Sequence, residues 1–420
     1  MTNLSINKSL LGNAIRVVTK HIPHAQTIAM GVYINVGARD ETLEKSGISH
    51  FIEHMIFKGT TSRNAYQIAK ELDAIGGHAN AFTAMEYSCF FARFYHTHLN
   101  KIIDILFDIL LSSTFDPKEI DRERQVIFQE LKMLEDSSDD YVNYLIGKAF
   151  WGDHPMGRSI LGTFDSIQSF DSKMIRSYFR QWYSPEKMVI ALAGKVDHFP
   201  VVELLEKAFG QIPTRKNAIK RKYPEIQANK IIKYRDLEQV HIGMGARGYS
   251  VDSPKRYSFA VLNIILGGNM SSMLFQEIRE RKAMAYSVYS TPFMFSDTGM
   301  QTIFMSIDPS NAKEALHLVQ RILDKLIQKE ISESTLSEAI EYAKATIQLS
   351  EESINNQMVR LGQSELFYGR YLSIEEILEN IESVTAKDIQ WMADEILHIN
   401  NMAMALLGPI DDNIFADYME

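Results

Sequence analysis

The chain has 420 residues, which is too many for one ordinary hydrophobic core and suits two domains of roughly 200 residues each. Its formal net charge of −9 disfavours a nucleic-acid partner, because nucleic-acid binding needs a basic face. The single cysteine, Cys89, excludes an internal disulfide and a cysteine-based zinc site.

Strand-like and helix-like segments alternate through the first half of the chain. Alternating apolar and β-branched residues predict strands, and apolar residues at helical spacing predict helices. The expected strands are residues 14–19, 27–36, 87–95 and 188–194. The expected helices are residues 47–57, 65–75, 98–111 and 117–135.

A basic run between two prolines separates the two halves. Residues 213–224 contain five lysines and arginines, and we interpret them as a solvated linker rather than a nucleic-acid patch. The expected division is therefore an N-terminal domain at 1–212, a linker at 213–228 and a C-terminal domain at 229–420.

The second half restarts the order of the first. The tripeptide Gly-Ala-Arg follows a strand-like run at residues 37–39 and again at 245–247. Each copy precedes a run with helical spacing, the second at residues 257–266. This order predicts a duplicated domain with an offset of 208 residues. At that offset the residues His50, Glu53 and His54 become Ser258, Val261 and Leu262. Only the first half can therefore hold a metal through these positions.

Residues 50–54, His-Phe-Ile-Glu-His, carry the strongest chemical signal in the chain. On a helix, positions i, i+3 and i+4 share one face, so His50 and His54 can ligate one Zn²⁺. Glu53 lies beside them and can accept a proton from the attacking water. The arrangement is the inverted H-x-x-E-H form of a metallopeptidase motif.

A catalytic zinc needs a third protein ligand and one open position. The predicted helix at 117–135 offers several acids, among which Glu123 and Glu130 lie two turns apart and share a face. One could ligate the metal while the other orients a histidine. Spacing alone does not choose between them, and a solvated acidic face would give the same pattern.

The motifs of the first half resemble the signature of the pitrilysin family, also called the insulinase family. The resemblance lies in residues 37–41 (GARDE), Gly47 and residues 50–60 (HFIEHMIFKGT). It is closest to the β-subunit of mitochondrial processing peptidase and its single-chain bacterial relatives. The family's third ligand is a glutamate about 76 residues after the second histidine, which implies Glu130 as ligand and Glu123 as its supporting acid.

Two further motifs extend the resemblance to most of the chain. Residues 76–86 resemble the family's edge strand, where Asn80 and Ala81 would meet the substrate backbone. Residues 274–288 resemble the C-terminal motif, in which Arg279 and Tyr286 would reach the substrate. One departure is Lys282-Ala283, where relatives commonly have Arg-Gly.

The resemblance implies a fold and an activity. The fold is α+β, with two similar domains that face each other as a clamshell, each a mixed β-sheet with helices packed on it. The activity is zinc-dependent hydrolysis of unfolded or short peptides bound as an added β-strand, with one Zn²⁺ per chain. Tyr286, assisted by Arg279, would stabilise the negative charge of the intermediate. Relatives of this length commonly form homodimers.

Two alternatives remain at this stage. A non-catalytic binding subunit of the same family would have lost the metal motif, which is complete here. A zinc hydrolase of a non-peptide substrate would have no use for a peptide-binding edge strand. Because the chain shows neither a secretory signal nor an apolar run of about 18 residues, we expect a soluble cytoplasmic protein with no membrane partner.

Overall fold

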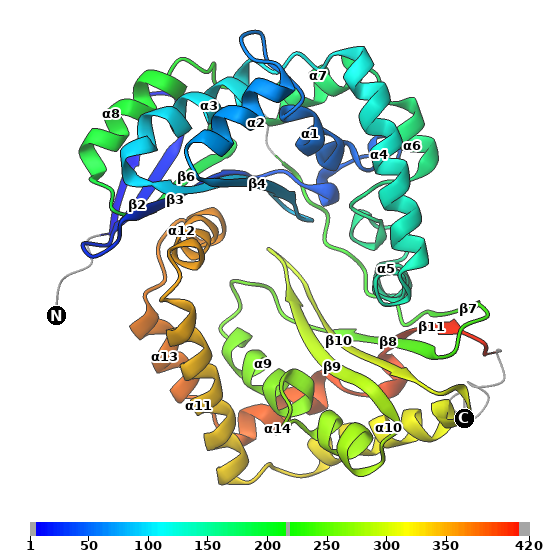
Figure 1. The fold of residues 1–420 in the computed structure, drawn as a ribbon. Helices are drawn as coiled ribbons and strands as arrows, with labels where there is room; N and C mark the ends of the chain where they lie inside the picture. Colours follow the sequence, from blue (N-terminus) through cyan, green and yellow to red (C-terminus); the bar gives the residue numbers. More distant parts are fainter. Residues whose placement is uncertain (1–5, 216–218, 411–420) are drawn as a thin grey trace. The chain divides into compact units, whose positions relative to one another are not determined.

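The computed structural model describes residues 6–215 and 219–410, which form two compact units (Figure 1). Unit 1 is drawn from residues 1–132, 159–221 and 349–371, and unit 2 from 133–158, 222–348 and 372–420. The chain therefore passes between the units five times. These packing units divide the chain differently from the two contiguous halves expected from the sequence, since each unit includes a segment of the other half.

Unit 1 is built on a mixed sheet of six strands in the order β1-β2-β6-β3-β5-β4. The strands are β1 (Ile6–Leu10), β2 (Arg16–His21), β3 (Thr27–Ile34), β4 (His78–Thr83), β5 (Ser88–Tyr95) and β6 (Met188–Gly194). Strands β2 and β6 run parallel and the other pairs are antiparallel. In the central register, Val32 lies opposite Phe90 on one side and Ile190 on the other. Strand β4 is an edge of the sheet.

Helices pack on both faces of this sheet (Figure 1). The helices assigned wholly to unit 1 are α1 (Ile48–Ile56), α2 (Ala65–Ala74), α3 (Leu99–Leu111), α6 (Phe164–Ser169), α7 (Ser172–Trp182), α8 (His198–Phe209) and α12 (Ile354–Tyr368), and most of α4 (Pro117–Asp136) belongs here too. The larger core lies between the sheet and helices that include α1 and α3. On the opposite face α12 approaches closely at Gly362, where a Cβ atom would lie 2.2 Å from the ring of Tyr33.

Unit 2 has a sheet of five strands in the order β7-β11-β8-β10-β9. The strands are β7 (Lys230–Tyr234), β8 (Val240–Arg247), β9 (Ala285–Met294), β10 (Gly299–Ile307) and β11 (Ala403–Gly408). Its helices include α5 (Ser138–Trp151), α9 (Arg256–Asn263), α10 (Ala312–Gln328), α13 (Ile374–Glu382) and α14 (Ala386–Ile396), with most of α11 (Glu333–Ser350). Across residues 6–215 and 219–410, we find no helix whose length and apolar character would let it cross a bilayer.

The two sheets share one topology, which confirms the α+β class with two similar domains. Removing β1 from the first sheet leaves β2-β6-β3-β5-β4, which matches β7-β11-β8-β10-β9 in order and in strand direction. In each unit one helix from the other half of the chain packs on the sheet. Helix α5 of the first half contacts β8 and β11, and α12 of the second half contacts β3 and β6.

Every helix and strand predicted from periodicity is present, with ends shifted by a few residues. Helix α1 begins one residue later and ends one residue earlier than expected, and β6 matches its prediction at both ends. The helix expected at 257–266 ends as α9 at Asn263 and continues as a π-helical segment, Ile264–Gly268. The pattern thus located the predicted elements to within a few residues and did not show this change of helical type.

The interpretation of the basic run as a solvated linker is wrong for Arg221. Its guanidinium donates to both carboxylate oxygens of Asp40, from Nε and Nη2, each at 2.9 Å. Nη2 also donates to the backbone oxygen of Glu86 at 2.7 Å. Arg221 therefore anchors this end of the run to unit 1, at Asp40 in the segment that precedes α1.

Candidate metal centre

A glycine and a buried carboxylate set the start of helix α1. Gly47 has φ +90°, and a Cβ atom there would lie 2.6 Å from the backbone oxygen of Leu161. The carboxylate of Glu41 accepts hydrogen bonds from the amides of Gly47 at 2.6 Å and Ser49 at 2.8 Å. It therefore satisfies two donors that the first turn of a helix leaves without an intrahelical partner. Both features fix the direction in which α1 leaves the preceding loop.

The two sides of α1 have different tasks. Phe51, Ile52 and Met55 are buried in the core of unit 1 and hold the helix against the sheet. His50, Glu53 and His54 are only partly buried. The i, i+3, i+4 spacing thus presents the two imidazoles and one carboxylate together, as the sequence predicts.

Helix α4 provides the carboxylates that face α1. Ile120 and Ile127 pack into the core, and Glu123, one turn beyond Ile120, is also buried at 5% exposure. Glu130 lies two turns after Glu123 and its side chain is one-third exposed. Because Ile120 and Ile127 pack into the core, they fix the side of α4 on which both glutamates lie.

His50, His54 and Glu130 form a cluster that could hold a metal ion. One possible ligand atom from each residue lies within 4.8 Å of the others, and the search of the described residues found this group. Nε2 of His50 is 3.7 Å from one oxygen of Glu130, and Nε2 of His54 is 3.6 Å from the other. Two ligands each about 2.1 Å from a tetrahedral zinc stand roughly 3.4 Å apart, so these residues fit such an ion.

Glu123 orients one of the two histidines. Its Oε2 lies 3.0 Å from Nδ1 of His54, so an Nδ1–H group on His54 donates to the carboxylate and leaves the Nε2 lone pair toward the cluster. Nδ1 of His50 is buried and has no hydrogen-bond partner among the described residues. Spacing alone leaves Glu123 and Glu130 equivalent. In the structure Glu130 lies beside Nε2 of both histidines, whereas Glu123 contacts Nδ1 of His54.

Burial and charge act differently on these groups. Burial, and then the neighbouring His54, lower the pKa of His50 to about 3, which keeps its imidazole neutral. Burial also acts to lower the pKa of His54, but the hydrogen bond to Glu123 and the charge of Glu130 outweigh it, so the pKa is raised. Burial acts to raise the pKa of Glu123, but the hydrogen bonds from His54 and Lys58 outweigh it, so the pKa is lowered.

Glu53 has a partner that the sequence analysis missed. Oγ1 of Thr83, at the end of β4, donates to Oε2 of Glu53 at 2.6 Å. Burial raises the pKa of Glu53, and the Thr83 hydrogen bond opposes this shift. Thr83 lies inside the segment that resembles the family's edge strand, but threonine on a strand gives no chemical signal of its own.

The remaining predicted residues have clear positions in their own units. Asn80 is exposed and Ala81 is buried on β4, at the sheet edge of unit 1. In unit 2, Tyr286 is 80% exposed, and the guanidinium carbon of Arg279 lies 5.4 Å from the centre of its ring. Ala283 has φ +51°, a conformation that favours glycine, at the position where relatives commonly have glycine. Their roles toward a substrate stay predictions.

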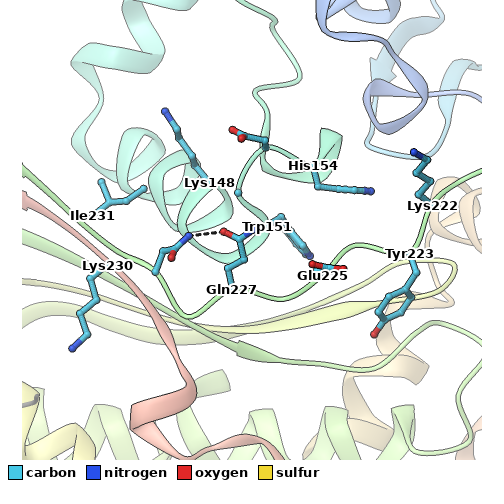
Figure 2. Close-up of a pocket in the computed structure, with 12 residues that line it drawn as sticks. Lys148, Trp151, His154, Lys222, Tyr223, Glu225, Gln227, Lys230 and Ile231 are labelled. Carbon is cyan, nitrogen blue, oxygen red and sulfur yellow. Dashed lines mark hydrogen bonds between the residues drawn. The ribbon is translucent and has the colours of Figure 1, made fainter. Parts of the chain in front are cut away.

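A polar groove of about 680 Å³ lies in unit 2 (Figure 2). Its lining comes from the end of α5 and from residues 222–231, and includes Lys148, Trp151, His154 and Gln227. The backbone N–H of Gln227 donates to the backbone oxygen of Phe150 at 2.8 Å, which holds the segment against α5. None of the predicted site residues lines this groove.

Comparisons with known proteins agree with the sequence motifs. The family model described as insulinase (peptidase family M16) matches residues 16–164, and the model described as the peptidase M16 inactive domain matches residues 169–342. The zinc protease YmxG of Bacillus subtilis (strain 168) is 38% identical over 94% of this chain and 97% of its own length. A zinc protease of Mycobacterium leprae (strain TN) is 35% identical over 96% of this chain and 91% of its own length.

Solved structures show the same fold. A protease from Helicobacter pylori superposes with a TM-score of 0.91 at 22% identity, covering 96% of this chain and 99% of that one. A structure of a peptidase M16 inactive domain from Pseudomonas fluorescens gives a TM-score of 0.91 at 16% identity, covering 97% and 99%. At these identities the likeness concerns the fold alone.

Proposed function

This chain belongs to the insulinase family, peptidase family M16, and we propose that it is a zinc-dependent endopeptidase that hydrolyses unfolded or short peptides. The observation that carries the proposal is the cluster of His50, His54 and Glu130, with Glu53 on the same helix face. Two imidazoles in their neutral form and one carboxylate are ligand types of catalytic zinc sites. The names of the two zinc protease relatives support the choice of metal.

We propose that one zinc ion per chain is held by His50, His54 and Glu130. When bound, zinc supplies a Lewis acid that polarises the scissile carbonyl and makes the attacking water more acidic. The rest of the chemistry falls to side chains of this chain. Glu53 would take the proton of the attacking water and deliver it to the leaving amine. The hydrogen bond from Thr83 holds Glu53 in one orientation for both transfers.

The peptide would bind along strand β4. An edge strand leaves backbone donors and acceptors without a neighbouring strand, so an extended peptide can add to the sheet there with little sequence preference. Asn80 and Ala81 are the residues that we expect to meet the peptide backbone. Arg279 and Tyr286 would contact the substrate as well, with Tyr286 donating to the developing oxyanion.

Two properties of the whole protein complete the proposal. We propose that it acts in the cytoplasm, and that two chains form a homodimer, as is common among relatives of this length. Neither a nucleic acid nor a membrane is part of the proposed function. The substrate is a peptide, and its identity would come from the cleavage products.

The variant Glu53→Gln tests the proposal. It keeps the size of the side chain but removes the base, so we expect unchanged zinc content and a fall in peptidase kcat/KM of about 10²–10⁴-fold. Zinc per chain would be measured by mass spectrometry, together with hydrolysis of a mixed pool of unstructured peptides. The matched control is Glu119→Gln on α4, which removes the same charge away from the cluster and should cleave like the wild type.

Three outcomes would contradict the proposal in different ways. Wild-type cleavage by Glu53→Gln would remove Glu53 as the base. Stoichiometric zinc without cleavage by the wild type would favour a non-catalytic binding subunit. Absence of zinc from wild-type protein purified without chelators would overturn the metal site itself.

A further inference from the structure

The row of side chains that faces α4 from α1 extends one turn past the last histidine, to Lys58. His50, His54 and Lys58 stand at i, i+4 and i+8, and the amide of Lys58 still donates to the backbone oxygen of Met55 at 3.1 Å. The opposing row on α4 consists of Glu130 and Glu123. Lys58 pairs with Glu123, His54 with both glutamates, and His50 with Glu130. The two helices therefore meet in an antiparallel ladder of charged and polar pairs.

We infer that Lys58 is a positioning residue of the zinc site, which acts by holding the carboxylate of Glu123 where it orients His54. Nζ of Lys58 lies 2.6 Å from Oε1 of Glu123, and Nδ1 of His54 lies 3.0 Å from Oε2. Each oxygen of the carboxylate has its own donor, so the carboxylate cannot rotate without losing one of them. The inference rests on the proposed zinc site. It adds to that site a residue that contacts the partner of a ligand and not the ligand itself.

Burial makes this ion pair different from an ordinary surface pair. The side chain of Glu123 is 6% exposed and that of Lys58 is 32% exposed. An exposed pair contributes little because water and salt screen it. Removing the lysine here would leave a buried carboxylate with one donor instead of two, and such a carboxylate moves or admits water to regain a partner.

Among the described residues, only one of the two histidines has a side-chain partner behind its ring. Nδ1 of His50 has no hydrogen-bond partner there, whereas Nδ1 of His54 contacts the carboxylate of Glu123. Partners of this kind set the tautomer and ring orientation of a ligating histidine. The orientation of the metal ligands therefore depends strongly on the Lys58–Glu123–His54 chain of contacts.

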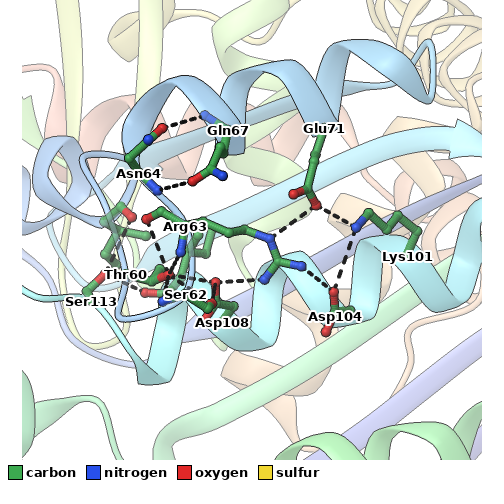
Figure 3. Close-up of polar contacts among 12 residues, drawn as sticks. Thr60, Ser62, Arg63, Asn64, Gln67, Glu71, Lys101, Asp104, Asp108 and Ser113 are labelled. Atoms are coloured by element: carbon green, nitrogen blue, oxygen red, sulfur yellow. Dashed lines mark hydrogen bonds and ion pairs between the residues drawn. The ribbon is translucent and has the colours of Figure 1, made fainter.

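The loop after Lys58 is itself anchored, which keeps the lysine in position (Figure 3). Gly59 has φ +137°, which lets the chain turn directly after the helix. The hydroxyl groups of Thr60 and Ser62 donate to the same oxygen of Asp108 on α3, at 2.7 and 2.8 Å. Arg63 donates to that oxygen as well, at 2.7 Å. The backbone that carries Lys58 is therefore held at both ends.

Zinc affinity, measured by competition with a chelator, tests the inference on the full chain. Replacing an outer partner of a zinc ligand typically costs 10–100-fold in affinity. We expect Lys58→Met to weaken zinc binding by about 10-fold, and Lys58→Arg to restore most of the loss because it returns a cation. The matched control, Lys118→Met on the exposed start of α4, should leave the affinity unchanged.

A double-variant cycle separates positioning from a general effect on folding. If Lys58 acts through Glu123, then adding Lys58→Met to Glu123→Gln should weaken zinc binding by less than about twofold further. A full additional loss in that background would overturn the inference, as would wild-type affinity in Lys58→Met alone. If wild-type protein binds no zinc, the proposed function fails before the role of Lys58 is reached.

Discussion

The two units share a scaffold, yet among the described residues only the first brings together side chains that could hold a metal ion. Helix α1 occupies residues 48–56, and α9, at the offset of 208 residues, occupies residues 256–263. At the positions of Glu53 and His54, α9 has Val261 and Leu262, both fully buried in the core of unit 2. The same helix position therefore serves packing in unit 2 and, in the function we propose, chemistry in unit 1.

The helices that carry the carboxylates differ in the same way. Counted from the first residue of each helix, Glu123 and Glu130 of α4 correspond to Ala339 and Thr346 of α11. Strand order is retained, and each of the six residues with a proposed metal-site role is replaced. The proposed function therefore depends on a few side chains placed on the fold and not on the fold itself.

The largest expected effect comes from making α1 resemble α9. In His54→Leu, one ligand is replaced by the residue that unit 2 has at that position. We expect zinc content to fall to near zero, because a catalytic site rests on three protein ligands. Far-ultraviolet circular dichroism should be unchanged, since leucine fits a helix well. Retained stoichiometric zinc in this variant would contradict the assignment of His54.

A smaller effect should distinguish the starts of the two helices. Gly47 has a positive φ and close backbone neighbours, whereas Lys255, the corresponding residue before α9, has an ordinary helical conformation. We expect Gly47→Ala to lower the free energy of unfolding by about 1–3 kcal/mol. Lys255→Ala should cost about 1 kcal/mol or less, since it removes a half-exposed side chain.

Urea unfolding of both variants measures this difference in the free energy of unfolding. Equal losses for Gly47→Ala and Lys255→Ala would mean that the entry to α1 carries no special constraint. A loss at Gly47 that is accompanied by weaker zinc binding would further tie the helix start to the geometry of the cluster.

The last comparison is a pH dependence that His50 gives to unit 1 and that Ser258, at the corresponding position, cannot give to unit 2. The pKa of His50 is about 3 in the folded chain against an ordinary value of 6.5, so below that value the unfolded chain binds a proton that the folded chain does not. The stability of zinc-free protein should therefore fall as pH decreases from 6.5 toward 3, with this group contributing at most about 1.4 kcal/mol per pH unit.

The variant His50→Ser carries the residue found at position 258 and should show a shallower pH dependence over that range. Comparing it with the wild type cancels the contributions of the groups that both proteins share, including the raised pKa of Glu53. Parallel stability curves for the two proteins would contradict the low pKa of His50.

Short-range patterns in the sequence predicted much of this structure. The buried strand β6 and the amphipathic helices α1 and α4 follow from local periodicity, and the histidine pair follows from helix geometry. The choice of Glu130 over Glu123 came from the family resemblance, because two acids on one helix face look alike from spacing alone.

Long-range contacts were not accessible in the same way. Nothing local shows that α5 packs on the sheet of unit 2, or that α12 packs on the sheet of unit 1. The partner of Glu53, Thr83, is 30 residues away, and Arg221 reaches Asp40 across 181 residues. Polar residues such as these are usually solvated, so only the packed structure reveals the contacts they make.

Anomalous X-ray scattering at the zinc absorption edge, from crystals of protein purified without chelators, tests the central claim most directly. We expect one anomalous peak per chain, bounded by His50, His54 and Glu130, and none beside Ser258 in unit 2. A peak at other residues, or none in crystals supplied with zinc, would contradict the metal site and the function built on it.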